Sequence, residues 1–284
     1  VWMGEILFRT KLSENLFKGL APWMQKLPGG LIHVNVVGCA LFAAISGSSA
    51  ATVATVGKMS IPELRKRKYP EKILLGSLAG SGTLGLLIPP SIILIIYGVA
   101  VQESIAKLFI AGIIPGIMIA LIFMSYVIIW SLLNKKEMPK IEEDFSFFEK
   151  LKISKQLLPV ILLIVGVIGS IYTGIATATE AASLGVVGAL LLSYFQKSLN
   201  YRNFKSSLLG ATKTSCMIAF ILAGSTFLSL AMGFTGLPRN LAIWIQSMDL
   251  SPYVLIFVLM IFYIILGMFL DGISAVVLTM AIIE

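Results

Sequence analysis

The sequence is poor in the side chains that build disulfides, metal sites and charged surfaces, with two cysteines, one histidine and only 13% charged residues among 284. Cys39 and Cys216 fall in apolar stretches without metal-like spacing, so we expect both to be small buried packing residues. The scarcity of charge, together with 57% apolar residues and a mean hydropathy of +0.94, excludes a water-soluble globular protein.

Long apolar runs are abundant instead. Several reach the roughly 20 residues that a helix needs to cross a ~30 Å hydrocarbon core, and the ten-residue alternation of an outer-membrane barrel is not found. The composition therefore predicts an all-α polytopic membrane protein.

Lysine and arginine concentrate in three linkers, at 58–72, 134–155 and 197–213. The positive-inside rule places all three in the cytoplasm, which puts an even number of crossings between successive linkers. The apolar runs between them are 73–98 and 105–133, then 156–174 and 177–195. Orientation explains the net charge of +8, and we expect no nucleic-acid partner. The amphipathic, lysine-bearing stretch at 10–28 predicts a helix lying in the membrane interface.

The ends of the chain are unusual for a membrane protein. It begins at Val1 rather than Met, and it ends at Glu284 inside an apolar run. We expect a piece of a longer chain, so a signal peptide cannot be assessed and any count of spans is a lower bound.

Residues 29–57 form an apolar run with a small polar segment, SGSS, at its midpoint. Each half is too short to span, which predicts a re-entrant helical hairpin whose tip lies near the bilayer midplane and lines a cavity. A single kinked span, with serines that bond back to their own helix, is the alternative.

A second such segment lies in the apolar run 251–284, where DGISA at 271–275 matches SGSSA at 46–50 in Gly, Ser and Ala. One crossing at 214–233 would make this second hairpin enter from the opposite face, so the two predict inverted repeats. Asp271 is a costly intramembrane carboxylate and a candidate for binding Na⁺ or a proton. A protonated or snorkelling aspartate at a kink is the alternative.

The stretch SGTLGLLIPPSIILII, at 81–96, is apolar enough to span but carries glycines and the pair Pro89 and Pro90. It predicts a broken helix beside the SGSS tip, with the carbonyls of residues 85–88 exposed as hard oxygen ligands for Na⁺. Hydroxyls such as Ser81 and Thr83 could face a carboxylate substrate. A flexible glycine-rich packing helix is the alternative, but it does not explain the two prolines.

Glu180 follows Thr177 and Thr179 at an expected helix start. A carboxylate there either caps the helix or takes part in an ion relay, and the sequence leaves both open.

Four motifs in order, AAISGSSAATVATVG, GSLAGSGTLGLLIPPSI, GIATATEAASLGV and LGMFLDGISAVVLT, resemble the large membrane subunit of tripartite ATP-independent periplasmic (TRAP) transporters, of the DctM type. The resemblance covers essentially the whole chain. It implies an elevator-type fold with inverted repeats, located in the bacterial inner membrane. It also implies Na⁺-driven uptake of an organic acid, such as a dicarboxylate or sialic acid, together with a small membrane (Q) subunit and a periplasmic binding protein.

Carried over by motif, the resemblance implies two Na⁺ sites. One would involve Ser46 and Ser49 with carbonyls of Gly82, Gly85, Ile88 or Pro90, and the other Gly267 and Asp271. The candidate substrate-binding residues are Ser48, Ser81, Thr83, Thr179, Glu180 and Ser274. We expect an arm and scaffold segment at 1–28 and a first hairpin with its broken helix at 29–104. Scaffold and transport helices would follow at 105–250, and the second hairpin at 251–284. Its own proline-containing broken helix would lie beyond Glu284.

Two other functions deserve comparison. An intramembrane serine protease would need His33 in contact with a serine of SGSS, but at about 1.5 Å per helical residue His33 lies some 20 Å from the tip. A stand-alone ion-coupled carboxylate carrier would use the same hairpins and broken helices, and only the resemblance argues against it.

Overall fold

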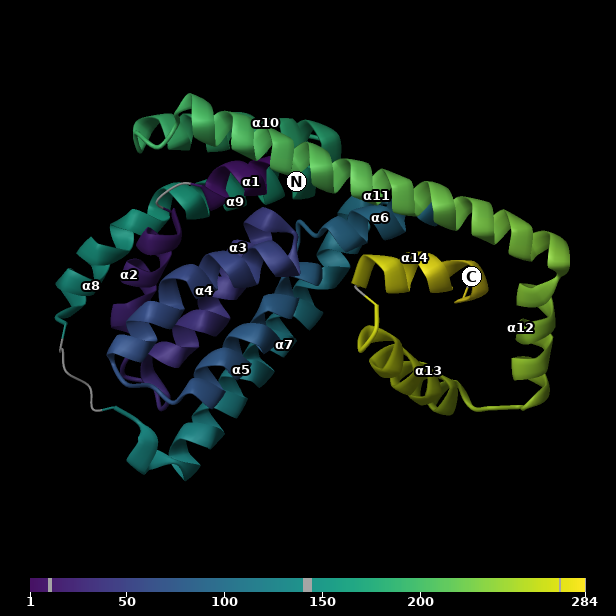
Figure 1. The fold of residues 1–284 in the computed structure, drawn as a ribbon, viewed down its shortest axis with the longest axis horizontal. Helices are drawn as coiled ribbons and strands as arrows, with labels where there is room; N and C mark the ends of the chain where they lie inside the picture. Colours follow the sequence, from purple (N-terminus) through teal and green to yellow (C-terminus); the bar gives the residue numbers. More distant parts are fainter. Residues whose placement is uncertain (10–11, 140–144, 271, 284) are drawn as a thin grey trace.

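The computed structural model describes residues 1–9, 12–139, 145–270 and 272–283, and every regular element among them is helical (Figure 1). The α-helices are α1 (Trp2–Phe8), α2 (Leu12–Met24), α3 (His33–Ser46), α4 (Ser49–Lys66), α5 (Glu71–Gly82), α6 (Ile92–Ala100), α7 (Ile105–Leu133), α8 (Phe147–Ser154), α9 (Leu158–Tyr172), α10 (Ala178–Phe195), α11 (Tyr201–Thr235), α12 (Leu237–Ser247), α13 (Pro252–Gly267) and α14 (Gly272–Ile283). Short 3₁₀ segments are η1 (Gly30–Ile32), η2 (Thr83–Leu86), η3 (Lys135–Glu137) and η4 (Lys155–Leu157).

Within the described residues, four helical stretches are long and apolar enough to cross a bilayer: 105–133, 147–172, 178–195 and 201–235. Three of them contain or overlap the predicted runs 105–133, 156–174 and 177–195, and the fourth contains the predicted crossing at 214–233, whereas the predicted run 73–98 is interrupted. The four stretches carry large apolar side chains on the outside, such as Ile114 (77% exposed) and Phe220 (82% exposed). Surfaces of this kind are stable against lipid rather than water. The prediction of an all-helical, polytopic membrane protein is confirmed at this level.

Helix α3 lies at the centre of the main core. It contacts α1, α2, α4, α5 and α7, and most of its side chains are buried. Its sequence is mostly apolar around the whole helix, as expected for a helix surrounded by others. The buried Asn35 amide donates to the Leu74 carbonyl (3.2 Å) and the Ser77 hydroxyl (3.0 Å), which joins α3 to α5.

Helices α3 and α4 fold back on each other at residues 47–48. A Cβ built on Gly38 would lie 3.7 Å from Val56 Cγ1, so residues nine before and nine after Gly47 face each other. This antiparallel packing excludes the single kinked span. Gly47 ends α3 with φ +60°, the left-handed conformation that glycine adopts at helix C-termini, and Ser48 caps the start of α4.

The break expected in the next helix is present. Helix α5 ends at Gly82, η2 tightens the chain over 83–86, and α6 begins only at Ile92, with Ser91 as its N-cap. Pro89 and Pro90 have no N–H to donate, and the ring of Pro90 disfavours a preceding helical turn.

Helices α13 and α14 form a second fold-back near the C-terminal end, with α14 beside α6 (Figure 1). The Tyr263 hydroxyl lies 2.6 Å from the Thr279 hydroxyl, which pairs the two helices. The Ser225 hydroxyl of α11 donates to the Val277 carbonyl (2.8 Å), which holds α14 against α11.

Two features differ from the sequence-based expectations. The basic linker at 197–213 is helical from Tyr201 onward and continuous with the crossing, because Asn200 caps a helix there and no proline interrupts it. Helix α12 was not predicted. Figure 1 shows it turning away from the far end of α11 and leading toward α13.

The cysteine prediction is half right. Both thiols are free; Cys39 is buried in α3, but Cys216 is exposed. The expectation for Cys216 is wrong because α11 has exposed side chains on most sides beyond its contacts with α1.

Candidate functional site

The tip of the first hairpin lies directly against the broken helix. The Ile92 N–H donates to the Gly47 carbonyl (3.4 Å), and a Cβ on Gly47 would meet the Pro90 carbonyl oxygen at 2.8 Å. The absence of a side chain at Gly47 therefore permits contact between the two backbones. The juxtaposition of tip and break that the sequence predicts is found.

Gly85, which belongs to the broken helix, likewise permits close contact with the backbone of the hairpin tip. A Cβ on Gly85 would stand 2.9 Å from the Ser48 carbonyl oxygen and 3.0 Å from the Ser49 nitrogen. At Gly82, a Cβ would collide with Val53 of α4. Glycines on α5 and η2 thus bring the start of α4 within backbone contact of the break.

Hydroxyl groups at the tip form a small buried network. The Thr52 hydroxyl donates to the Ser48 carbonyl (2.7 Å) and lies 2.9 Å from the Ser46 hydroxyl, which is 3.3 Å from the same carbonyl. Thr52 is fully buried, and sequence reasoning missed it. Its position one helical turn after Ser48, as a polar residue in an apolar run, was the available signal.

Ser49 differs from its neighbours. It is partly buried at the first position of α4, and its hydroxyl forms no hydrogen bond with any described residue. An oxygen without a partner beside two backbones is available to a ligand.

The carbonyl groups of the break are only partly used. Leu84 O accepts the N–H groups of Leu87 and Ile88, and Leu86 O accepts the Ser91 hydroxyl. Among the described residues, no donor reaches the carbonyls of Leu87, Ile88 or Pro90. The exposed carbonyls expected at 85–88 are therefore found in part, since Leu86 is occupied.

The two hydroxyls predicted to face substrate on α5 and η2 are committed to their own helix. Ser81 is fully buried and donates to the Ser77 carbonyl (2.5 Å), whereas Thr83 is exposed and donates to the Gly80 carbonyl (2.6 Å). Their contact with substrate stays a prediction.

The second tip reaches the same break. A Cβ on Gly272 would meet Ile93 Cδ1 at 2.8 Å and Leu86 Cδ1 at 3.2 Å. Gly267 ends α13 and faces open space, and Ser274 is partly buried in the first turn of α14. Asp271 lies outside the described residues.

The two tips are not equivalent in backbone. In the match of SGSSA with DGISA, Gly47 aligns with Gly272, yet Gly47 is left-handed between helices whereas Gly272 already belongs to α14. Helix α3 ends at Ser46 and α4 begins at Ser49, whereas α13 ends at Gly267 and α14 begins at Gly272.

Thr179 and Glu180 lie elsewhere, at the start of α10. The Glu180 carboxylate accepts the Thr177 N–H and hydroxyl (both 2.8 Å), and Thr177 Oγ1 accepts the Glu180 N–H (3.3 Å). This is a complete capping box, the first of the two roles left open for Glu180. Thr179 is exposed.

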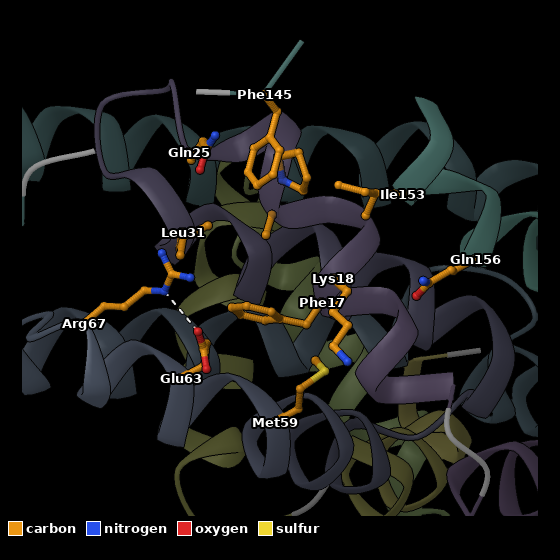
Figure 2. Close-up of a pocket in the computed structure, with 12 residues that line it drawn as sticks. Phe17, Lys18, Gln25, Leu31, Met59, Glu63, Arg67, Phe145, Ile153 and Gln156 are labelled. Atoms are coloured by element: carbon orange, nitrogen blue, oxygen red, sulfur yellow. Dashed lines mark hydrogen bonds and ion pairs between the residues drawn. The ribbon is translucent and has the colours of Figure 1, made fainter. Parts of the chain in front are cut away.

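A cavity of about 570 Å³ lies between α2 and α4, with Phe17, Met59 and an ion pair between Glu63 and Arg67 (3.0 Å) on its walls (Figure 2). Glu63 lies about 20 Å along α4 from Ser49, at about 1.5 Å per residue. This cavity is therefore separate from the junction of the tips and the break.

No group of three or more His, Cys, Asp or Glu side chains that could hold a metal ion occurs among the described residues. What the junction does offer is neutral oxygen, from hydroxyls and free carbonyls, and the N-termini of α4, α6 and α14. Such groups can coordinate a hard monovalent cation and face an anion.

Comparison with protein families matches residues 1–284 to "Tripartite ATP-independent periplasmic transporter, DctM component". The chain belongs to the DctM family. It is 36% identical over 258 residues to the C4-dicarboxylate TRAP transporter large permease protein DctM of Pseudomonas aeruginosa. The aligned region covers 89% of this chain and 58% of that protein. It is 34% identical to the protein of the same name from Rhodobacter capsulatus (98% and 66%). It is also 31% identical to the sialic acid TRAP transporter large permease protein SiaM of Vibrio cholerae (98% and 65%).

The chain thus spans less than two thirds of the length of these DctM-family relatives. They are transporter permeases, not enzymes. The structure also argues against the serine-protease hypothesis. His33 lies at the end of α3 opposite the serines, where its Nε2 atom bonds to the Pro28 carbonyl (2.8 Å).

Proposed function

We propose that this chain carries most of the transport core of a large permease subunit that imports an organic acid across the bacterial inner membrane, driven by Na⁺. The observation that carries the proposal is the convergence of both hairpin tips on one break, through Gly47 and Gly85 on one side and Gly272 on the other. In membrane transporters, irregular backbone within the bilayer occurs where it is buried in protein or lines a binding cavity.

Na⁺ is the proposed co-transported ion. One ion would be bound at the first tip by the hydroxyls of Ser46 and Ser49 and by carbonyls of the break, of which those of Ile88 and Pro90 are without donors. Gly82 and Gly85 would serve by letting the tip come close. A second ion would be bound at the second tip, near Gly267 and Asp271.

The substrate is proposed to be a carboxylate, such as a C4-dicarboxylate or sialic acid. Support comes from the names of the relatives and from the helix N-termini at the junction, where Ser48 caps α4 and Ser91 caps α6. Helix N-termini present N–H groups and a partial positive charge to anions. We propose that Ser48 and Ser274, at the starts of α4 and α14, contact the substrate.

Transport is proposed to follow an elevator mechanism. The two hairpins are treated as re-entrant, inverted repeats that move with the broken helix past scaffold helices. The description of the family as tripartite supports two further components, a small membrane (Q) subunit and a periplasmic binding protein that delivers the substrate.

Uptake by the full-length protein with its small subunit in liposomes tests the proposal. We expect uptake of a labelled C4-dicarboxylate or sialic acid only with both an inward Na⁺ gradient and the cognate binding protein. Uptake that is indifferent to Na⁺ would refute the coupling. Uptake without the binding protein would favour a stand-alone carboxylate carrier.

Site assignment needs matched variants. Ser49→Ala and Asp271→Asn should raise the Na⁺ concentration for half-maximal uptake. Ser183→Ala should not, because its hydroxyl bonds only to the Thr179 carbonyl on the exposed side of α10. An unchanged Na⁺ response in both Ser49→Ala and Asp271→Asn would show that the ions bind elsewhere.

A further inference from the structure

A cavity at the junction of α1 and α11 holds an unusual excess of positive charge. Its volume is about 500 Å³, and its walls include four cationic side chains, Arg9, Arg202, Lys205 and Lys213, and no carboxylate. The Arg9 guanidinium is paired with Glu5. Among the described residues, Arg202, Lys205 and Lys213 form no ion pair, and all three are exposed.

The junction that carries these charges is well fixed. Arg9 Nε donates to the Ser206 hydroxyl (3.0 Å), Trp2 Nε1 donates to the Ser207 hydroxyl (3.3 Å), and the Trp2 and Phe204 rings meet edge to face. Gly210 leaves room for the Glu5 carboxylate against α11. These contacts hold Arg9, at the end of α1, against the first turns of α11 beside the cations of that helix.

The three unpaired cations lie on one face of α11. The positions 202, 205, 209 and 213 are three or four residues apart, so Leu209 shares their face and Lys213 lies about 16 Å along the axis from Arg202.

The length of α11 places this face at the membrane surface. The helix has 35 residues, whereas about 20 suffice to cross the hydrocarbon core. All of its charged residues fall before Thr214, and the rest of the helix is uncharged. Its first turns therefore lie at headgroup level, on the side that carries the basic linkers.

We propose that this cavity binds the headgroup of an anionic glycerophospholipid from the cytoplasmic leaflet. The phosphodiester would lie among Arg202, Lys205 and Lys213, while the acyl chains run along exposed apolar side chains further along the same face of α11, such as Met217 and Phe220. Basic pockets between membrane helices on the cytoplasmic side are suited to such lipids. The site is distinct from the hairpin tips and independent of the transported substrate.

The test measures lipid binding to the full-length protein in detergent micelles. Phosphatidylglycerol is added at increasing mole fraction, and phosphatidylcholine and inorganic phosphate are added separately. Native mass spectrometry counts the bound lipids, and intrinsic fluorescence records the unfolding temperature. We expect phosphatidylglycerol to be retained and to raise the unfolding temperature, with no effect of the other two.

The variant is Lys205→Gln with Lys213→Gln, and the matched control is Lys135→Gln with Lys136→Gln, which removes the same charge from another basic linker. The first pair should weaken phosphatidylglycerol binding about tenfold or more, and the control should leave it unchanged. Equal binding by the first pair and the wild type would overturn the proposal. So would an equal loss in the control, or the same thermal shift with inorganic phosphate.

Discussion

The carbonyl oxygen of Pro90 occupies the space where a side chain on Gly47 would begin, 2.8 Å from an ideal Cβ, and Gly47 itself has φ +60°. Two independent constraints, a backbone conformation and a backbone contact, thus fall on one residue. The distance between hairpin tip and broken helix depends on its having no side chain.

Gly47→Ala should therefore destabilise the tip. The left-handed conformation alone costs about 1 to 2 kcal/mol for a residue with a Cβ, and the contact with Pro90 must also open. We expect a lower unfolding temperature and reduced uptake. Gly76→Ala is the control, because a Cβ there meets nothing within 4 Å, and alanine favours a helix by up to about 1 kcal/mol. Equal effects of the two changes would contradict this account.

Thr52→Val tests the hydroxyl network of the first tip. The change keeps the shape of the side chain but removes the hydroxyl that contacts both the Ser46 hydroxyl and the Ser48 carbonyl, so each of these buried groups loses a partner at a cost of about 1 to 3 kcal/mol. We expect weaker Na⁺ dependence of uptake and lower stability. Thr55→Val removes a buried hydroxyl that bonds only to the Ala51 carbonyl of its own helix, and it should leave the Na⁺ response unaltered. A normal Na⁺ response in Thr52→Val would separate the network from ion binding.

Substitution of Glu180 tests whether its carboxylate only caps α10 or also binds an ion or the substrate. The capping box needs only hydrogen-bond acceptors on this side chain, which glutamine also has, so Glu180→Gln should keep most uptake. Thr177→Ala removes the N-cap hydroxyl and should cost about 1 kcal/mol of stability. Loss of uptake in Glu180→Gln, with an unchanged unfolding temperature, would assign the carboxylate to an ion or substrate instead.

Tyr263→Phe tests the pairing of α13 with α14. It removes the hydroxyl that lies 2.6 Å from Thr279 Oγ1 and should lower stability by about 1 kcal/mol, with faster amide hydrogen exchange in α14. Tyr253→Phe, on the same helix, should change neither measurement, because Tyr253 is 85% exposed and no described residue bonds to its hydroxyl. Identical exchange in both variants would show that the hydroxyl pair does not hold the hairpin.

Local signals made much of this arrangement predictable. Apolar length predicts the run 105–133, which is α7, and the glycines with Pro89 and Pro90 predict the break before α6. Each of these depends on residues close together in the chain, as do the two helix reversals.

What could not be predicted depends on packing between distant segments. The burial of Ser81 follows from which face of α5 meets its neighbours, and the exposure of Cys216 from how far α11 extends beyond α1. The sequence does not distinguish the conformations of Gly47 and Gly272, because glycine is accepted both in a left-handed turn and as the first residue of a helix. Thr52 was overlooked because its partners are known only once the tip has folded.

The contact of Gly272 with Leu86 and Ile93 has a thermodynamic consequence. The same short segment, from Leu86 to Ile93, forms a wall for both tips, with Gly47 against Pro90 and Ile92 on the other side. A ligand that shifts this wall on binding at one tip must alter the affinity at the other. Under the proposed Na⁺ coupling, linkage would make the effect reciprocal: substrate would change the affinity for the ion by the same factor as the ion changes the affinity for substrate.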